Sequence, residues 1–311
     1  MKFQLKQICI CIFLVVMPML SIAFDITRCV DKDYTIQLLG SGGPIPGDSR
    51  AQSGTVLWWN NKSKILIDVG SGVFLRFNQA DAKIEDLDFL GITHLHTDHS
   101  VDIPAFIKAG YFSSRKAVLD ISGPSGNQSF PSINQYFQRL FNSKDGVYAY
   151  LGDIFSNNGD AFPVRITEVA TKAATNKQVL VFKNNNFKIF ALSVPHGNVP
   201  ALAYRIDSIK GSVVISGDQN GKNPKFIQFA KGANVLIMAL AIDEHVVTDL
   251  HATPSTIGQM AQEINPKILI LNHFMGSGLV NKNNSLQIIK KYYKGIIVGG
   301  RDLECIPIGK I

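Results

Sequence analysis

Four short apolar segments of the chain each end in a histidine or an aspartate, and this pattern limits the possible folds more than any other feature. The segments are LDFLGITH, FKIFALSVPH, SVVISGD and ILILNH. Short apolar runs bounded by turn residues are typical of buried β-strands. In sheet-based enzymes, ligands bind in the loops that follow strand ends at one edge of the sheet. We therefore expect such an edge to carry His94, His196, Asp218 and His273.

Strands and helices alternate along the chain in two batches. The first batch predicts strands over 34–39, 55–59, 64–69 and 87–94, and the second over 187–194, 201–206, 212–216, 234–240 and 267–271. Helices are predicted over 73–80, 103–112, 132–141, 223–230, 253–264 and 284–293. Two mixed batches predict an α/β fold in which two sheets pack face to face with helices outside, a four-layer αββα sandwich. Residues 113–187 are the least readable part.

The first 23 residues have the composition of a secretory signal peptide. Lys2 and Lys6 precede an apolar run from Ile8 to Leu20, and the small residues of SIA follow it. The run is short for a membrane span. We therefore expect residues 1–23 to be removed, residues 24–311 to form one hydrolase domain without a transmembrane segment, and the product to be secreted or periplasmic.

The charge and the cysteines that remain after residue 23 bear on possible partners and on a possible disulfide. Without Lys2 and Lys6 the 31 basic residues become 29, against 24 acidic residues, so the net charge is +5. This balance favours anionic partners such as phosphate or sulfate esters, nucleic acid or lipid head groups, and it serves solubility equally well. Cys29 and Cys305 remain after export and can form one disulfide, although the sequence leaves a free pair equally open.

The stretch HLHTDHS, residues 94–100, offers two pairs of metal ligands. His94 and His96 are two residues apart and point the same way in extended backbone. Asp98 and His99 lie in the turn beyond. Four ligands are too many for one open metal site, and imidazole with carboxylate suits zinc, manganese or iron. A third ligand for each of two ions must come from elsewhere, with His196 and His273 as candidates and Asp218 able to bridge.

HLHTDH matches the HxHxDH motif of the metallo-β-lactamase superfamily. LLGSGGPIPGDSR, SVPHGNVPALAYRI, VVISGD and LHATPSTIGQM with ILILNHF extend the resemblance over residues 36–274, and they are most similar to the ribonuclease Z, phosphodiesterase and arylsulfatase-like branch. The resemblance implies two divalent ions, zinc before manganese or iron, and a bridging hydroxide as nucleophile. One ion would be held by His94, His96 and His196, the other by Asp98, His99 and His273, and Asp218 would bridge them. Asp98 and His251 would be the catalytic side chains, with His251 as general acid.

Two departures from the branch weaken a role in transfer RNA processing. Ribonuclease Z carries a long arm for transfer RNA between the third histidine and the bridging aspartate, whereas Asp218 follows His196 by only 22 positions here. Ala239 stands where those enzymes have a glutamate that partners the acid histidine, and Asp243 or Glu244 is a candidate replacement.

The sequence thus predicts an exported binuclear metal hydrolase that cleaves phosphodiesters or sulfate esters of small anionic substrates. A ribonuclease Z-like endoribonuclease, which would act on nucleic acid without an arm, remains an alternative. A lactonase or β-lactamase-like hydrolase of esters or amides and a non-catalytic metal-binding domain also remain. The sequence leaves a homodimer open. His245 matches no motif and is expected at the surface.

Overall fold

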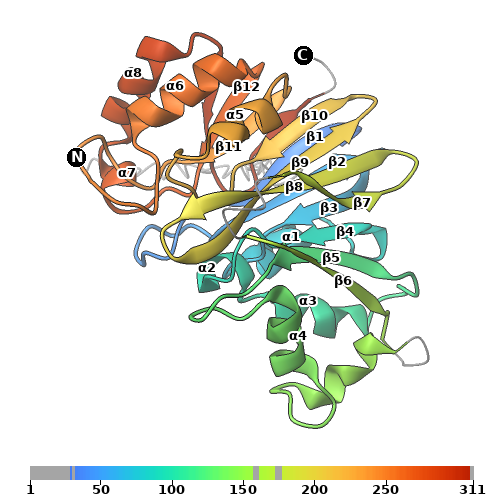
Figure 1. Ribbon diagram of the computed structural model, residues 1–311. Coiled ribbons are helices and arrows are strands. Elements are labelled where there is room, and N and C mark those ends of the chain that lie inside the picture. The colour runs from blue at the N-terminus through green and yellow to red at the C-terminus, as the bar shows by residue number, and fades with distance from the viewer. Residues whose placement is uncertain (1–28, 30–31, 157–160, 172–176, 309–311) are drawn as a thin grey trace, which may run out of the picture.

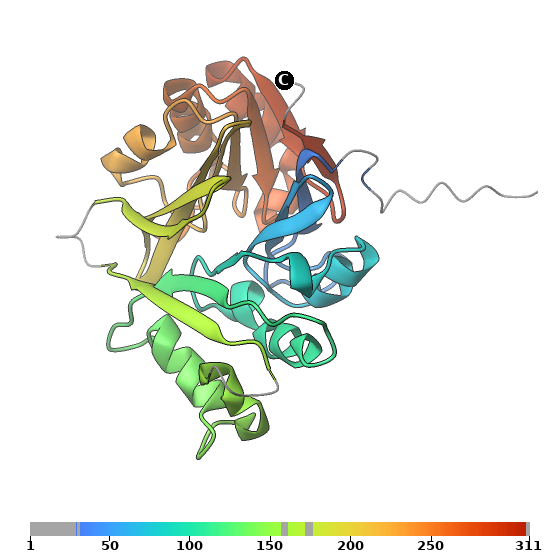
Figure 2. The same ribbon diagram turned by 90° about the vertical axis from the view of Figure 1, so that its right-hand side faces the viewer.

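Two seven-stranded β-sheets packed face to face form the centre of the molecule (Figure 1). The computed structural model describes residues 29, 32–156, 161–171 and 177–308, so the predicted signal peptide lies outside the described residues. Helices lie on the outer side of each sheet, and Figure 2 shows the two groups of helices on opposite sides of the strands. The expected αββα sandwich is therefore confirmed.

The first sheet has the strand order β14-β1-β2-β3-β4-β5-β6. Its strands are β1 (Tyr34–Gly40), β2 (Gly54–Trp59), β3 (Lys62–Ile67), β4 (Phe89–Gly91), β5 (Leu119–Pro124), β6 (Val164–Val169) and β14 (Cys305–Pro307). Its outer face packs against α1 (Val73–Gln79), α3 (Ile103–Gly110) and α4 (Ile133–Phe141). Three short elements complete this half: α2 (Thr97–Ser100) and the 3₁₀ turns Ile84–Asp86 and Ala149–Phe155.

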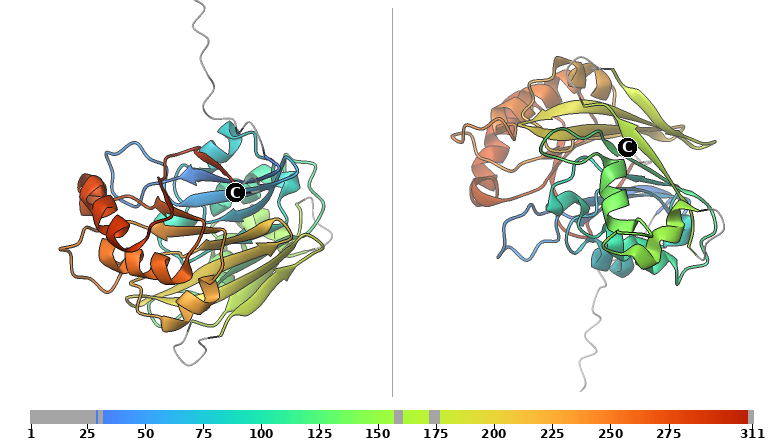
Figure 3. Two further views of the ribbon diagram at one scale, coloured as in Figure 1. Left: turned by 90° about the horizontal axis from the view of Figure 1, so that it is seen from above. Right: turned by 60° about the horizontal axis from the view of Figure 1, so that its bottom comes forward.

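The second sheet has the order β13-β12-β11-β10-β9-β8-β7. Its strands are β7 (Val179–Lys183), β8 (Phe187–His196), β9 (Val199–Ser208), β10 (Gly211–Ile215), β11 (Val235–Ala239), β12 (Ile268–Asn272) and β13 (Ile296–Gly299). Its outer face packs against α5 (Pro224–Ala230), α6 (Pro254–Ile264) and α8 (Lys282–Tyr292), with the short α7 (Gly276–Val280) after β12. Seen from above, the blue strands of the first sheet lie beside the yellow strands of the second (Figure 3).

The core between the sheets explains why several strands read as unbroken apolar runs. All five residues of β12 are buried, because one face meets the first sheet and the other meets the helices. Strands covered on both faces show no alternation of apolar and polar residues. Within the described ranges, no helix is both long and apolar enough to span a membrane.

The direction of the strands delivers the predicted side chains to one edge. Strands β10 to β13 are parallel to each other, and β8 runs the same way because both β8 and β10 are antiparallel to β9. The C-terminal ends of β8, β10 and β12 therefore lie at the same end of the second sheet. There they place His196, Asp218 and His273.

The strand predicted over 87–94 is shorter than expected, and the reason lies at the site. Only Phe89–Gly91 pairs as β4. Beyond it the chain crosses to the second sheet, where the carbonyl of Thr93 accepts a 2.9 Å hydrogen bond from the amide of Leu202. The hydroxyl of Tyr204 in β9 lies 3.1 Å from the carbonyl oxygen of Ile92. These contacts fix His94 between the two sheets.

The segment 113–187 contains three strands that the sequence analysis did not predict. They are β5, β6 and β7, whereas the helix predicted over 132–141 is confirmed as α4. Strand β6 has only one fully buried residue, and β7 also has only one, so neither shows a strong apolar pattern. Both are edge strands of their sheets.

A disulfide joins Cys29 to Cys305, with a Cα–Cα distance of 5.7 Å. Cys305 begins β14, which pairs with β1 at the edge of the first sheet. The bond that the sequence left open is therefore present, and it fastens the start of the described chain to its last strand.

We expect Cys305→Ser to lower the free energy of unfolding of the protein by about 2–5 kcal/mol, because the bond closes a loop of nearly the whole chain. Urea denaturation followed by circular dichroism measures the loss. Cys29→Ser and the double variant remove the same bond, so they should show the same loss. Additive losses would contradict this account.

Candidate metal centre

The structure brings together all seven predicted metal ligands and His251 at the shared edge of the two sheets. Their ligand atoms form four overlapping groups, each within 4.8 Å: His94, His96 and His196; His94, His99 and Asp218; Asp98, His99 and His273; His196, Asp218 and His251. The first and third groups coincide with the two half-sites expected from the sequence. His245 is exposed, as expected.

The first half-site consists of three imidazoles that stay neutral. Burial lowers the pKa of His94 well below its ordinary value and also lowers the pKa values of His96 and His196. Nδ1 of His196 donates to the carbonyl oxygen of Leu250 over 2.7 Å. This bond fixes the tautomer and leaves Nε2 with a free lone pair. That Nε2 is buried and has no hydrogen-bond partner. A neutral imidazole with an orphaned, buried nitrogen suits a metal ion.

The second half-site combines imidazoles with carboxylates. Nε2 of His273 lies 3.1 Å from Oδ2 of Asp98, and Nε2 of His99 lies 3.5 Å from the same oxygen. Burial pulls the pKa of His99 down, but the nearby carboxylates outweigh it and hold that pKa well above its ordinary value. The pKa of His273 is raised in the same way. The buried carboxylates therefore require positive charge at this position, which a divalent cation can supply.

Asp218 occupies the centre of the cluster. Its Oδ2 lies 3.2 Å from His273, 3.6 Å from His99, 3.8 Å from His196 and 3.9 Å from His94. Burial opposes its charge, yet the surrounding histidines hold the pKa of the carboxyl well below its ordinary value. One oxygen at similar distances from both half-sites is the geometry that a bridging ligand needs.

Gly217 makes this placement possible. Its φ is +57°, and a Cβ there would lie 2.5 Å from the carbonyl oxygen of Leu202. Only glycine combines this left-handed conformation with so close an approach to β9. The turn after β10 can thus aim Asp218 into the space between the sheets.

Asp68 contacts the second half-site, and the sequence analysis did not single it out. Its Oδ2 lies 2.9 Å from Nδ1 of His99, and its carboxylate also accepts hydrogen bonds from the amide and hydroxyl of Thr93 at 2.7 and 2.8 Å. A carboxylate behind a metal-binding histidine orients the ring and raises its basicity. The sequence signal is an acidic residue directly after the buried strand β3, but the strand predicted over 64–69 includes this residue.

His251 lies against the cluster, with Nδ1 4.0 Å from Oδ2 of Asp218. Burial lowers its pKa to about 4, and its buried Nδ1 has no hydrogen-bond partner. The suggestion that Asp243 or Glu244 partners it does not hold. Glu244 accepts hydrogen bonds from the amide and hydroxyl of Ser255, and the carboxylate of Asp243 accepts from His245 and Asn281.

A small cavity of about 30 Å³ lies beneath the cluster, between the sheets. Ala239, at the end of β11, forms part of its wall together with Asn272, whose Oδ1 has no hydrogen-bond partner. A cavity of this volume with several polar groups in its wall can hold ordered water. The space beside the short side chain of Ala239 is therefore not filled by protein.

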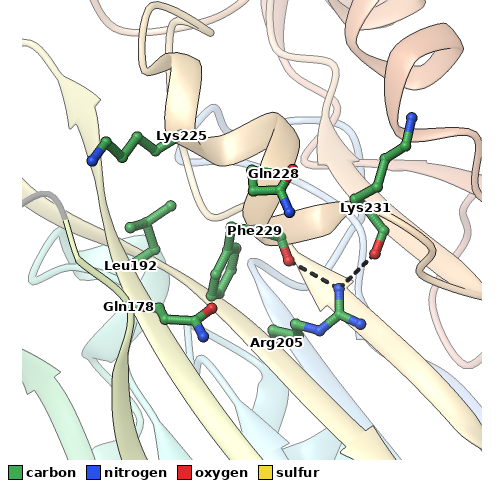
Figure 4. A pocket seen from close by; sticks show the side chains of 7 residues that line it. All are labelled: Gln178, Leu192, Arg205, Lys225, Gln228, Phe229 and Lys231. Carbon is green, nitrogen blue, oxygen red and sulfur yellow. Dashed lines mark hydrogen bonds between the residues drawn. The ribbon is translucent and has the colours of Figure 1, made fainter.

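Two larger grooves differ in their relation to the cluster. One, of about 470 Å³, is lined by His196 and by the neighbouring residues Asn127, Asn198 and Lys222. The other, of about 490 Å³, lies between α5 and the outer face of the second sheet (Figure 4). There Arg205 donates to the carbonyl oxygens of Phe229 and Lys231 at 2.9 and 3.0 Å, so its guanidinium anchors the end of α5.

The comparisons with known proteins agree with this fold. A family model described as the beta-lactamase superfamily domain matches residues 63–274. A ribonuclease Z from Methanosarcina acetivorans is 25% identical over 296 residues, which cover 85% of this chain and 94% of that protein. The crystal structure of the metallo-beta-lactamase fold protein YhfI from Bacillus subtilis has a TM-score of 0.67 at 21% identity, covering 88% of this chain and 98% of that one. The crystal structure of the short form of human tRNase Z has a TM-score of 0.67 at 19% identity, covering 88% of this chain and 99% of that one.

The fold and the histidine–aspartate cluster define a metal-dependent hydrolase with the metallo-β-lactamase fold. The chain belongs to the beta-lactamase superfamily domain family, close to proteins named ribonuclease Z. The resemblance drawn from HLHTDH and its companion segments is therefore confirmed.

We expect Asp218→Ala to reduce metal occupancy at both half-sites, because the carboxylate is the one group central to both. Elemental analysis of the purified, zinc-equilibrated variant measures ions per chain. Asp145→Ala, at an exposed aspartate, is the control and should retain the wild-type content. Loss of only one ion from Asp218→Ala would show that the residue does not bridge.

Asp68→Asn should weaken one half-site selectively, because the amide no longer holds His99 in the metal-binding tautomer. We expect metal affinity at the half-site of Asp98, His99 and His273 to fall about 10–100-fold. Competition with a chromophoric chelator measures the two affinities separately. Equal weakening of both half-sites, or an equal effect of Asp145→Asn, would contradict a specific role for Asp68.

Proposed function

We propose that the chain is a binuclear metal-dependent phosphodiesterase that acts outside the cytoplasm. The observation that carries the proposal is the pair of ligand groups, each of three side chains, arranged around the single buried carboxylate of Asp218. Histidine and carboxylate ligands without thiolate favour zinc, with manganese and iron as alternatives. Two divalent ions bound there would activate water and stabilise the charge on the entering and leaving oxygens of an ester.

The side chains divide the remaining work. His94, His96 and His196 would hold one ion, and Asp98, His99 and His273 the other, with Asp218 shared. Asp68 and the carbonyl of Leu250 fix the orientation of His99 and His196. Burial of the whole group lowers the local dielectric constant and strengthens each of these interactions.

His251 would supply the proton that the leaving oxygen needs, because the negative charge of an ester bound beside it would raise its lowered pKa and favour the protonated ring. It borders the cluster without filling either group of three, because Nδ1 approaches Asp218 only to 4.0 Å. Its ring centroid lies 5.1 Å from that of His196 and 5.6 Å from that of His273. A histidine between the two half-sites is within reach of an ester oxygen bound there.

Three observations support a phosphodiester as the substrate and export as the setting. The relatives named ribonuclease Z cleave RNA, as their name says, and RNA is a phosphodiester. The segment of residues 1–23 has the pattern of a signal peptide. The disulfide between Cys29 and Cys305 suits an oxidising compartment, so secretion or a periplasmic location is part of the proposal.

An endoribonuclease is the second candidate, and the names of the relatives favour it. The 21 residues between His196 and Asp218 contain β9 and β10, so a long arm is absent from that interval. An RNA substrate would therefore be bound by the rim of the site itself.

The decisive assay uses the mature protein loaded with zinc or manganese. We expect turnover of bis-p-nitrophenyl phosphate that is abolished by chelation and restored by metal. p-Nitrophenyl sulfate, precursor transfer RNA, a lactone and nitrocefin are tested in parallel. Hydrolysis of the lactone or nitrocefin, with no turnover of either phosphodiester, would overturn the proposal.

His251→Ala should lower turnover of bis-p-nitrophenyl phosphate by about 10²–10⁴-fold, because general acid catalysis contributes that much. Metal content should stay at the wild-type level. His245→Ala is the matched control, since this exposed histidine lies on the same loop, and it should change neither quantity. Loss of metal from His251→Ala would instead make His251 a ligand.

A further inference from the structure

The loop between β5 and α4 is folded tightly by its own hydrogen bonds. Oδ1 of Asn127 accepts from the amides of Ser129 and Phe130 at 2.8 and 2.9 Å, and the amide of Asn127 donates to the carbonyl of Phe130 at 2.9 Å. At Gly126 a Cβ would lie 2.6 Å from the amide nitrogen of Ser132. The loop therefore has one compact shape that does not depend on burial of Phe130.

The same loop is fastened to the opposite sheet beside the metal centre. Nδ2 of Asn127 donates to the carbonyl oxygen of Asn198 over 2.8 Å, and Nδ2 of Asn198 donates to Oγ of Ser129 over 3.2 Å. Asn198 lies in the turn between β8 and β9, two residues after His196. These two reciprocal bonds hold the loop next to the first half-site.

The ring of Phe130 stands at the open side of the cluster. Its centroid lies 5.9 Å from that of His96, with an angle of 60° between the ring planes. Among the five predicted histidine ligands, His96 is half-buried while the other four are buried. The cluster therefore reaches solvent at His96, and Phe130, itself half-buried, borders that opening.

An apolar ring held at a polar opening offers a flat surface for a planar group. Aromatic side chains stack on nucleobases and on aryl rings, and the stacking tolerates different ring chemistry. The groove of about 470 Å³ beside His196 begins at the same loop, being lined by Gly126 and Asn127. Its volume lies within the range of small-molecule sites, so a ring and its attached group have room.

We propose that Phe130 determines specificity by stacking on a planar ring, either aryl or nucleobase, carried by the ester bound at the metal centre. The preferred substrates are then aryl or nucleoside phosphodiesters rather than dialkyl ones. This inference rests on the proposed phosphodiesterase function.

The test compares three diesters on metal-loaded protein: bis-p-nitrophenyl phosphate, thymidine 5′-p-nitrophenyl phosphate and the ring-free glycerophosphoethanolamine. Removing a stacked ring costs about 5–100-fold in affinity. We expect Phe130→Ala to lower kcat/KM by that factor for at least one ring-bearing diester, mainly through KM. The fold-loss of kcat/KM for the ring-free diester should be at least about 5-fold smaller. A loss on the thymidine diester alone identifies the nucleobase as the partner, and a loss on both ring-bearing diesters identifies an aryl ring.

Two variants separate stacking from simple apolar contact. Phe130→Tyr keeps the flat ring and should restore most of the loss, whereas Phe130→Leu should behave like Phe130→Ala. Phe112→Ala removes a ring that is 82% exposed on the turn after α3, and it should alter none of the three rates. Equal losses on all three diesters, no loss on any, or full activity of Phe130→Leu would overturn the proposal.

A binding measurement separates this inference from the proposed function. If the wild-type protein hydrolyses none of the diesters, the phosphodiesterase assignment fails. Titration calorimetry with p-nitrophenyl phosphate, thymidine 5′-monophosphate and methyl phosphate then tests Phe130 alone. A weaker Kd of Phe130→Ala for a ring-bearing phosphate, relative to methyl phosphate, would support stacking, and an unchanged ratio would refute it.

Discussion

The buried carboxylate of Asp218 is the interaction on which the rest of the site depends. A charge removed from water is tolerated only when it is paired. Here the pairing comes from four imidazoles on three different segments, at 3.2 to 3.9 Å from one oxygen. Because those segments belong to both sheets, the electrostatic requirement of one side chain is met only when the whole sandwich is assembled.

The arrangement of the strands explains how four segments that are far apart in the sequence lie close together in the fold. Parallel strands end at a common edge, and the second sheet contributes three of them. The first sheet contributes the stretch after β4, which the Thr93–Leu202 hydrogen bond fixes against β9. The site is thus built on the rigid part of the molecule. Asp68, which orients His99, comes directly after strand β3, whereas the carbonyl of Leu250, which orients His196, lies in the loop between β11 and α6.

The role of a residue could be predicted from the sequence only where the residues next to it already indicated that role. His94, His96, Asp98 and His99 stand together after an apolar run, so their proximity was visible in the chain itself. His196, Asp218 and His273 were found because each follows a strand. Asp68 follows a strand too, but a single aspartate in IDVG has no neighbouring ligand to distinguish it. Its role depends on a 2.9 Å contact with His99, 31 residues away. Strands β6 and β7 were missed because edge position leaves their sequences mostly free of burial.

The disulfide at the edge of the first sheet has a consequence for association between molecules. Strand β14 has only three residues, and it covers the outer side of β1, whose seven residues are all buried. An uncovered strand of that length and apolarity would be a template for pairing with another chain. The bond from Cys305 to Cys29 keeps this short cover in place. The crosslink therefore protects this edge against intermolecular β-sheet growth, in addition to its contribution to folding stability.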